Sequence, residues 1–193
     1  MVWRIAGVRS TEQSGIIGVK RPFDTYLILY KLKTERKRKE NGGMMKAFLI
    51  LEDGTVFKGT SIGSTREIIS EIVFNTSMWG YLEVLTDPSY AGQAVCMTYP
   101  LIGNYGICHE DMESLRPWPD GYIVNELSRM PSNFRSDDTI QNFLEEHDIP
   151  GIAGIDTRAL TKILREKGTM NGMITTNENY NLDEILPKIK EYR

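Results

Sequence analysis

Cysteine is scarce in this 193-residue chain, and long apolar runs are missing from it. Only Cys96 and Cys108 are present, whereas a small disulfide-bonded domain usually carries several cysteines in pairs. No apolar run approaches the roughly 18–20 residues of a membrane-spanning helix, and the first residues show no signal-peptide pattern. These absences argue against a secreted or membrane protein. We therefore expect a cytoplasmic protein without a membrane partner.

Catalytic chemistry is also poorly represented, because few side chains could act as a nucleophile with a base beside it. Cys96 lies in the apolar run of residues 94–97, where burial would raise the thiol pKa, so a structural thiol is favoured over a nucleophile. Cys108 and His109 are neighbours in sequence, but adjacent side chains point in different directions, which disfavours a nucleophile–base pair. We predict no catalytic residue in this chain.

Patterns for metal and phosphate binding are missing as well. A zinc site built from Cys96, Cys108, His109 and His147 would have spacings that match no zinc finger or ribbon. The glycines of residues 103–106 lack the Lys-Ser/Thr of a phosphate-binding loop and the full dinucleotide fingerprint, so a turn is the favoured interpretation. We predict no metal, no cofactor and no ATP site in this chain.

Charge divides the sequence into two unlike parts. Residues 1–43 hold 10 Lys and Arg against 4 Asp and Glu, a net charge of +6, whereas the remainder holds 13 against 22, a net charge of −9. The acidic remainder has no electrostatic footprint for nucleic acid, so we expect no nucleic-acid partner. The basic run at residues 33–40 leaves a nucleic-acid-binding arm open as an alternative.

The charge break predicts a boundary, because it coincides with the Asn-Gly-Gly turn of residues 41–43. We predict a basic N-terminal extension over residues 1–43 and a folded domain over residues 44–193. The extension is either a disordered tail or upstream sequence, in which case translation would start at Met44 or Met45 instead of Met1.

Short apolar runs between turn residues predict a strand-rich domain. The Asp53-Gly54 pair predicts a hairpin turn between the first two strands. The expected strands cover residues 47–51, 55–58, 69–75, 94–98, 121–124, 151–154 and 172–175.

Apolar residues at helical spacing predict helices among and after these strands. The best specified helix covers residues 157–167, with Asp156 as its N-cap, Ile155 and Leu160 as a hydrophobic staple, and Gly168 after its last residue. Its apolar residues form one stripe, which predicts packing against the sheet.

Two further helices are expected. One covers residues 140–147 behind a cap at residues 136–137 (Ser136 and Asp137), and the other covers residues 181–190, where Pro187 should kink or restart the helix. The expected strands come first along the chain, and the expected helices lie between the later strands and after them. This order indicates an α/β or α+β domain.

A helix-length segment framed by polar turns, residues 74–90, is the most informative part of the sequence. Polar residues 75–77 follow an apolar strand and can cap the next helix or turn. Pro88 should then end that helix, because it lacks a backbone donor and moves Asp87 out of the α region. Ser89 lies in this turn, where its hydroxyl most simply makes a local hydrogen bond.

Five blocks of the sequence together carry a family resemblance. They are residues 74–90 (FNTSMWGYLEVLTDPSY), 92–93 (GQ), 98–106 (TYPLIGNYG), 132–135 (SNFR) and 155–161 (IDTRALT). In order and spacing they resemble the amino-terminal domain of the small (glutamine) subunit of carbamoyl phosphate synthetase, over residues 45–176. Trp79 departs from the smaller polar residue of that family, and Cys108-His109 is not a family signature.

The resemblance implies a fold, a reaction and partners. The implied fold is the swivelling β/β/α domain of the small subunit. In the family, the small subunit hydrolyses glutamine and passes ammonia to a large subunit, which uses bicarbonate, ATP and Mg²⁺ to make carbamoyl phosphate for arginine and pyrimidine synthesis. The expected partners are the large subunit and glutamine. The family's amidotransferase domain, with its Cys, His and Glu, has no counterpart here, so we expect a fragment or truncated reading frame that is inactive alone.

Ser89 is the site residue that the resemblance assigns. In the family, the Ser of the Thr-Asp-Pro-Ser-Tyr motif lies at the boundary with the amidotransferase domain and helps to bind glutamine. Tyr99 and Asn104 are candidates to support the same surface, without an assigned role. A noncatalytic binding module of the same fold, which docks on a partner, remains the alternative.

Overall fold

The computed structural model describes residues 45–128 and 130–192. The extension predicted over residues 1–43 and its alternative interpretations lie outside the described residues. The strands are β1 (Lys46–Leu51), β2 (Val56–Gly63), β3 (Ile68–Asn75), β4 (Gln93–Met97), β5 (Leu101–Ile102), β6 (Gly121–Ile123), β7 (Glu126–Leu127), β8 (Pro150–Ala153) and β9 (Met170–Thr175). The helices are α2 (Tyr81–Thr86), α3 (Ile140–Glu146), α4 (Thr157–Lys167) and α5 (Leu182–Glu191), with 3₁₀ turns η1 (Pro88–Tyr90) and η2 (His109–Asp111).

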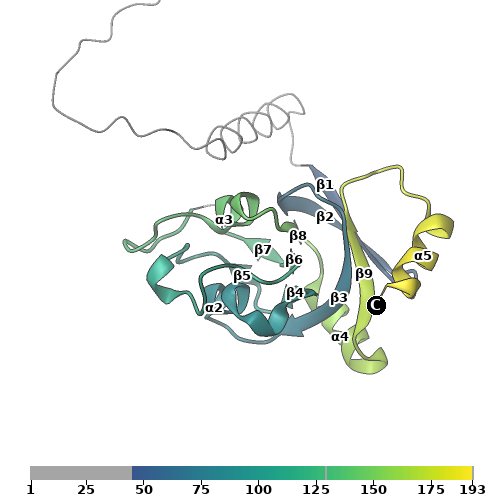
Figure 1. The fold of residues 1–193 in the computed structure, drawn as a ribbon, viewed down its shortest axis with the longest axis horizontal. Helices are drawn as coiled ribbons and strands as arrows, with labels where there is room; N and C mark the ends of the chain where they lie inside the picture. Colours follow the sequence, from purple (N-terminus) through teal and green to yellow (C-terminus); the bar gives the residue numbers. More distant parts are fainter. Residues whose placement is uncertain (1–44, 129, 193) are drawn as a thin grey trace, which may run out of the picture. The chain divides into compact units, whose positions relative to one another are not determined.

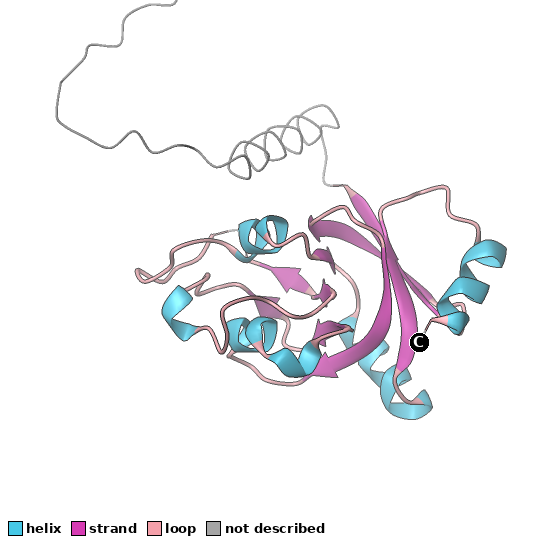
Figure 2. Cartoon of the chain, in the orientation of Figure 1, coloured by secondary structure: helices cyan, strands magenta, loops and turns pink. Residues whose placement is uncertain are grey.

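Strand β9 closes the main sheet into a barrel, because it pairs with β1 along one edge and with β3 along the other. Within the described residues the strand order around the barrel is β1-β2-β8-β6-β4-β3-β9. The pairs among β3, β4, β6 and β8 are parallel, and the remaining pairs are antiparallel. The short strands β5 and β7 form a separate parallel pair. Figures 1 and 2 show the strands curving around one another, with the helices on the outside.

Side chains that alternate along the barrel strands form one core cluster. Successive residues of a strand face opposite sides, so one face of β1, β3, β4, β6, β8 and β9 contributes to this cluster, and Phe57 of β2 packs against it. Helix α4 adds Leu160 and Leu164. The strand residues in it are Ala47, Leu49, Leu51, Ile68, Ile72, Ala94, Cys96, Ile123, Ile152, Met170 and Ile174.

The opposite faces of the strands are covered by the other helices. Val95 and Met97 of β4 pack with Leu82 of α2 and Phe143 of α3 in a second cluster. Phe48 and Ile50 of β1 pack with Ile189 of α5 in a third. Strands β1 and β4 are therefore buried on both faces, which explains their nearly unbroken apolar runs.

The seven predicted strands are confirmed as the seven barrel strands, with ends that differ by a few residues. Helix α4 is also confirmed, and its cap is the predicted one, because Asp156 Oδ1 accepts a hydrogen bond from the Ala159 amide at 2.9 Å. Ile155 and Leu160 share a core cluster, as the hydrophobic staple requires. The fold is a mixed, strand-rich α/β arrangement, and none of its described helices is long and apolar enough to cross a membrane.

The predicted cap of α3 is wrong. The N-cap is Thr139, whose Oγ1 accepts from the Asn142 amide at 3.2 Å. Ser136 and Asp137 are used elsewhere: Ser136 Oγ donates to the Asp138 carbonyl at 3.0 Å, and Asp137 Oδ2 accepts from the His109 amide at 3.2 Å.

Pro187 does not interrupt α5, which runs unbroken from Leu182 to Glu191. Pro187 is exposed, so its ring lies on the solvent side while Ile189 is buried against β1. The carbonyl that loses its helical donor belongs to Asp183, an exposed residue of the first turn where water can satisfy it.

Candidate functional site

The carboxyl end of β3 is organised by the side chain of Asn75. Its Oδ1 accepts a hydrogen bond from the Ser77 amide at 2.7 Å, and its Nδ2 donates to the Tyr90 hydroxyl at 2.9 Å. The Asn75 carbonyl accepts from the Thr98 amide at 3.0 Å. Asn75 therefore joins three segments: the turn before α2, the turn after it and the segment that follows β4.

Gly80 is the N-cap of helix α2, and its φ of 79° is a left-handed conformation that glycine adopts at little cost. Residues 75–77 were predicted to cap the next helix or a turn, and the structure shows the turn: Asn75 caps it locally, while α2 has no side-chain cap. The Tyr105 hydroxyl instead accepts from the amides of Gly80 and Tyr81, at 3.1 and 3.2 Å. This distant tyrosine satisfies two backbone donors near the start of the helix.

Tyr81 and Tyr105 form a stacked pair beneath the start of α2, with ring centroids 4.0 Å apart and an interplanar angle of 19°. The Tyr81 hydroxyl donates to the Gly106 carbonyl at 2.6 Å. Burial raises the pKa of both phenols, so both are neutral and able to donate at physiological pH. The pair fixes α2, and with it the turn that follows.

Ser89 lies in the exposed 3₁₀ turn η1, directly after α2. As predicted, the helix ends before Pro88, and Asp87 is extended with φ −80° and ψ 119°. Asp87 Oδ1 accepts from the Ser89 amide at 2.8 Å. This amide and, secondarily, the Ser89 hydroxyl hold the pKa of Asp87 below its usual range. The turn is thus fixed through its backbone, while Ser89 itself faces solvent.

The two turns that Asn75 joins form what we call the Ser89 surface, defined as Asn75, Met78, Trp79, Ser89 and Tyr90. Met78 and Trp79 expose 56% and 74% of their area, although both are large apolar side chains. The sequence predicted the turns but not their connection, because Asn75 and Tyr90 are separated by a helix.

The two supporting candidates from the sequence fall in different places. Tyr99 is exposed and follows Thr98, which is bonded to Asn75, so it lies beside the Ser89 surface. Asn104 belongs to a neighbouring loop, where its carbonyl accepts from the Ser132 amide at 2.8 Å.

Both cysteines are buried, and His147 contacts the backbone of its own helix. Cys96 is buried in β4, and burial raises its pKa to about 12. Cys108 is also buried. His147 lies at the end of α3, where its Nδ1 is 2.9 Å from the Phe143 carbonyl. In the part of the chain that the structure describes, no group of three or more His, Cys, Asp or Glu side chains is placed to hold a metal ion.

Comparison with known proteins gives a consistent answer over this whole region. Residues 49–174 match the family model described as carbamoyl-phosphate synthase small chain, CPSase domain. The chain belongs to this family. The match extends from β1 into β9 and includes the whole Ser89 surface, so it confirms the resemblance found in the sequence.

Individual carbamoyl phosphate synthase small chains are similar over about three quarters of this chain. The relative from Oceanobacillus iheyensis is 54% identical over 147 residues, which are 76% of this chain and 40% of the relative. The relative from Clostridium perfringens is 53% identical over 148 residues, 77% of this chain and 42% of the relative. The chain therefore spans about two fifths of the length of these small chains.

Proposed function

We propose that this chain is the amino-terminal, noncatalytic domain of the small subunit of a glutamine-dependent carbamoyl phosphate synthetase, with the swivelling β/β/α fold. The complete enzyme would take ammonia from glutamine and combine it with bicarbonate at the expense of ATP, in the cytoplasm, to supply arginine and pyrimidine synthesis. The family match over residues 49–174 is the observation that carries this proposal.

Within that enzyme, Ser89 would contribute to glutamine binding at the boundary with the amidotransferase domain. Two features support this role: the turn is exposed, and its backbone is held by Asp87 and by the Asn75–Tyr90 hydrogen bond. A hydroxyl on a fixed turn can bind a polar substrate with little loss of conformational entropy. Met78 and Trp79 would give the same surface the apolar area that a neighbouring domain can cover.

The chemistry at the substrate atoms would belong to other parts of the enzyme. The amidotransferase domain would supply the Cys nucleophile with its His and Glu partners, and the large subunit would hold ATP and Mg²⁺. This chain would then act by positioning, because Ser89 would hold glutamine while the reacting groups lie in the other parts of the enzyme.

A chimera tests the proposal. The 193-residue chain is joined to the amidotransferase part of the Oceanobacillus iheyensis small chain and combined with that organism's large subunit. We expect glutamine-dependent formation of carbamoyl phosphate, with the large subunit and ammonia alone as the control reaction. A folded chimera that binds the large subunit but supports only the ammonia-dependent reaction would contradict the proposed function and favour a noncatalytic binding module.

A further inference from the structure

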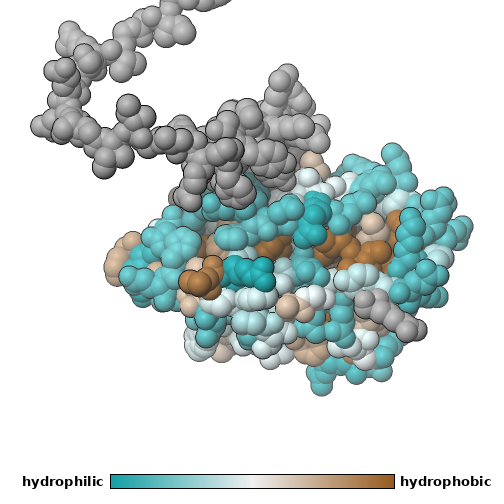
Figure 3. All heavy atoms as spheres, viewed as in Figure 1, coloured by the Kyte–Doolittle hydropathy of each residue, from teal (hydrophilic) through white to brown (hydrophobic). Residues whose placement is uncertain are grey.

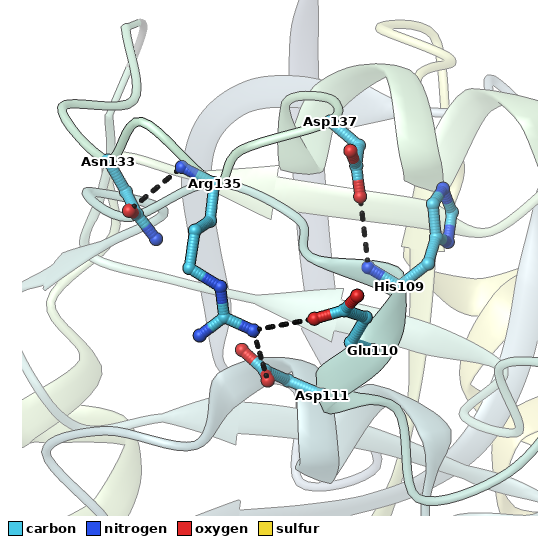
Figure 4. A network of polar contacts seen from close by, with 6 residues as sticks. All are labelled: His109, Glu110, Asp111, Asn133, Arg135 and Asp137. Atoms are coloured by element: carbon cyan, nitrogen blue, oxygen red, sulfur yellow. Dashed lines mark hydrogen bonds and ion pairs between the residues drawn. The ribbon is translucent and has the colours of Figure 1, made fainter.

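Phe134 is 96% exposed on the loop between β7 and α3, yet the residues on both sides of it are fixed. Asn133 Oδ1 accepts from the Arg135 amide at 3.1 Å. The Arg135 guanidinium reaches across to η2, where Nη2 donates to Glu110 Oε2 at 3.0 Å and to Asp111 Oδ1 at 3.3 Å. Figure 4 shows this side chain extended from the loop toward the two carboxylates.

Residues 132–138 of this loop are bonded to the segment of residues 104–111, which precedes and includes η2. The Ser132 amide donates to the Asn104 carbonyl at 2.8 Å. At the other end of the loop, the backbones of Ile107 and Asp138 form an isolated antiparallel bridge, with the Ile107 amide donating to the Asp138 carbonyl at 2.8 Å. The loop that presents Phe134 is therefore held at both ends.

Gly106 allows the two segments to approach so closely. Its φ is +74°, and a Cβ added there would lie 2.0 Å from Ser136 Oγ, far inside van der Waals contact. The position therefore requires glycine for its backbone conformation and for the space of the neighbouring loop. The close contact between the Gly106 segment and the Ser136 segment is therefore an integral part of the fold.

An exposed apolar residue is ordinary by itself, and Figure 3 shows the described part of one face with separate hydrophobic patches among hydrophilic residues. Phe134 differs in its setting. An aromatic side chain on a fixed loop loses little conformational entropy when a partner covers it, and aromatic anchors of this kind dominate the energy of many interfaces.

The charge around Phe134 indicates what its partner should carry. Glu110 is 83% exposed in its side chain, Asp111 is 40% exposed, and Asp137 is exposed next to them. Arg135 neutralises only part of this charge, and the described domain is acidic as a whole. A complementary partner would offer an apolar pocket with Lys and Arg at its rim.

We propose that Phe134 is an anchor that docks this domain onto the large subunit, in an apolar pocket rimmed by basic side chains. The inference rests on the proposed function, which assigns the Ser89 surface to the amidotransferase part and leaves the Phe134 loop for the other subunit. In Figure 1 the loop between β7 and α3 reaches the end of the domain away from α5. The acidic residues of η2 and of the loop contact the rim, and Arg135 holds the loop in the docking conformation.

Binding of the 193-residue chain to the immobilised large subunit of Oceanobacillus iheyensis tests the anchor. Phe134→Ser should weaken binding by at least about tenfold, whereas Phe134→Trp should retain most of it. Leu115→Ala, which removes another fully exposed apolar side chain, is the matched control and should bind like the unaltered chain. Because Phe134 is exposed, none of these variants should change the melting temperature by more than a few degrees.

The dependence of binding on salt distinguishes the contribution of Phe134 from that of the acidic residues around it. Binding of the unaltered chain should weaken as ionic strength rises, and Glu110→Gln should reduce that dependence mainly by slowing association.

If the unaltered chain binds and Phe134→Ser binds equally well, the proposal that Phe134 is an anchor is wrong, while the proposed function stands. If Phe134→Ser instead loses affinity only for the separate amidotransferase part, the assigned partner is wrong. No binding by the unaltered chain would overturn both the anchor and the large-subunit partner.

Discussion

The side-chain amide of Asn75 donates a hydrogen bond to the Tyr90 hydroxyl across 2.9 Å, and so ties the turn before α2 to the turn that carries Ser89. A double-mutant cycle measures this link. Tyr90→Phe should cost about 1 kcal/mol of unfolding free energy, since it removes one hydrogen bond. Asn75→Ala should cost more, because it also removes the bond to the Ser77 amide. The two losses in urea denaturation should be non-additive by about 0.5–1.5 kcal/mol, and simple additivity would show that the link contributes nothing.

Local features of this fold were readable from the sequence. The barrel strands follow from short apolar runs, and α4 follows from a cap, a staple and a terminal glycine that all agree. The helix stop before Pro88 was likewise predicted, because proline acts on its immediate neighbours. Each of these signals is contained within a few consecutive residues.

The features that escaped prediction join residues far apart in sequence. Closure of the barrel depends on β9 pairing with both β1 and β3, which no local pattern encodes. The amides at the start of α2 are satisfied by Tyr105, more than 20 residues away in the chain. The cap of α3 was misplaced for the same reason, since Asp137 is engaged by the distant His109 amide. Ser89 was assigned only through the family resemblance, and its role stays a prediction.

Asp87 should make the Ser89 turn sensitive to acid. Hydrogen bonding by the Ser89 amide lowers the pKa of Asp87 in the folded state. A lowered carboxylate pKa contributes stability above the unfolded pKa, near 3.9 for Asp, and loses it as pH falls through the folded value. The melting-temperature advantage of the unaltered chain over Asp87→Asn should therefore be largest above about pH 5 and shrink toward about pH 3.

Asp87 is only half-buried, so solvent screening keeps this effect small. Asp183→Asn, which alters an exposed aspartate in the first turn of α5, serves as a control for the general acid sensitivity of the fold. An advantage that stays constant from neutral to acid pH would contradict the role of the ionised Asp87 cap.

Helix α4 should respond very differently to changes at its cap and at its buried face. Asp156→Ala should cost about 1 kcal/mol, because the Ala159 amide loses its acceptor. Leu160→Asp should cost several times as much, roughly 3–5 kcal/mol, since it places an unpaired charge in the core cluster. Arg158→Ala, on the exposed side, should change the unfolding free energy by less than about 0.5 kcal/mol. Similar small losses for all three would mean that the helix is not packed on the sheet.

Cys96 should be unreactive while the domain is folded. Burial raises its pKa to about 12, so both access and the thiolate fraction are minimal at pH values near 8. Iodoacetamide labelling followed by peptide mass spectrometry should show Cys96 modified only as urea unfolds the chain, along the same transition that tryptophan fluorescence reports. Rapid modification of Cys96 in the absence of urea would contradict its place in the barrel core.

Ser89→Ala separates substrate binding from turn structure in the chimera proposed above. The Asp87 cap uses the Ser89 amide, so the 2.8 Å hydrogen bond survives the substitution and the melting temperature should hardly change. If the hydroxyl binds glutamine, its loss should cost about 0.5–1.5 kcal/mol, a rise in glutamine KM of roughly two- to tenfold. The rate at saturating glutamine should stay nearly constant, because the distant nucleophile is unaltered.

The ammonia-dependent reaction of the same chimera is the internal control, since external ammonia bypasses the glutamine site. It should be unchanged in Ser89→Ala. Asp87→Ala, which removes the cap but keeps the hydroxyl, should instead lower the melting temperature and raise the glutamine KM together, because the turn is no longer held. A Ser89→Ala chimera with an unaltered glutamine KM would exclude the binding role and leave Ser89 as a residue of the turn alone.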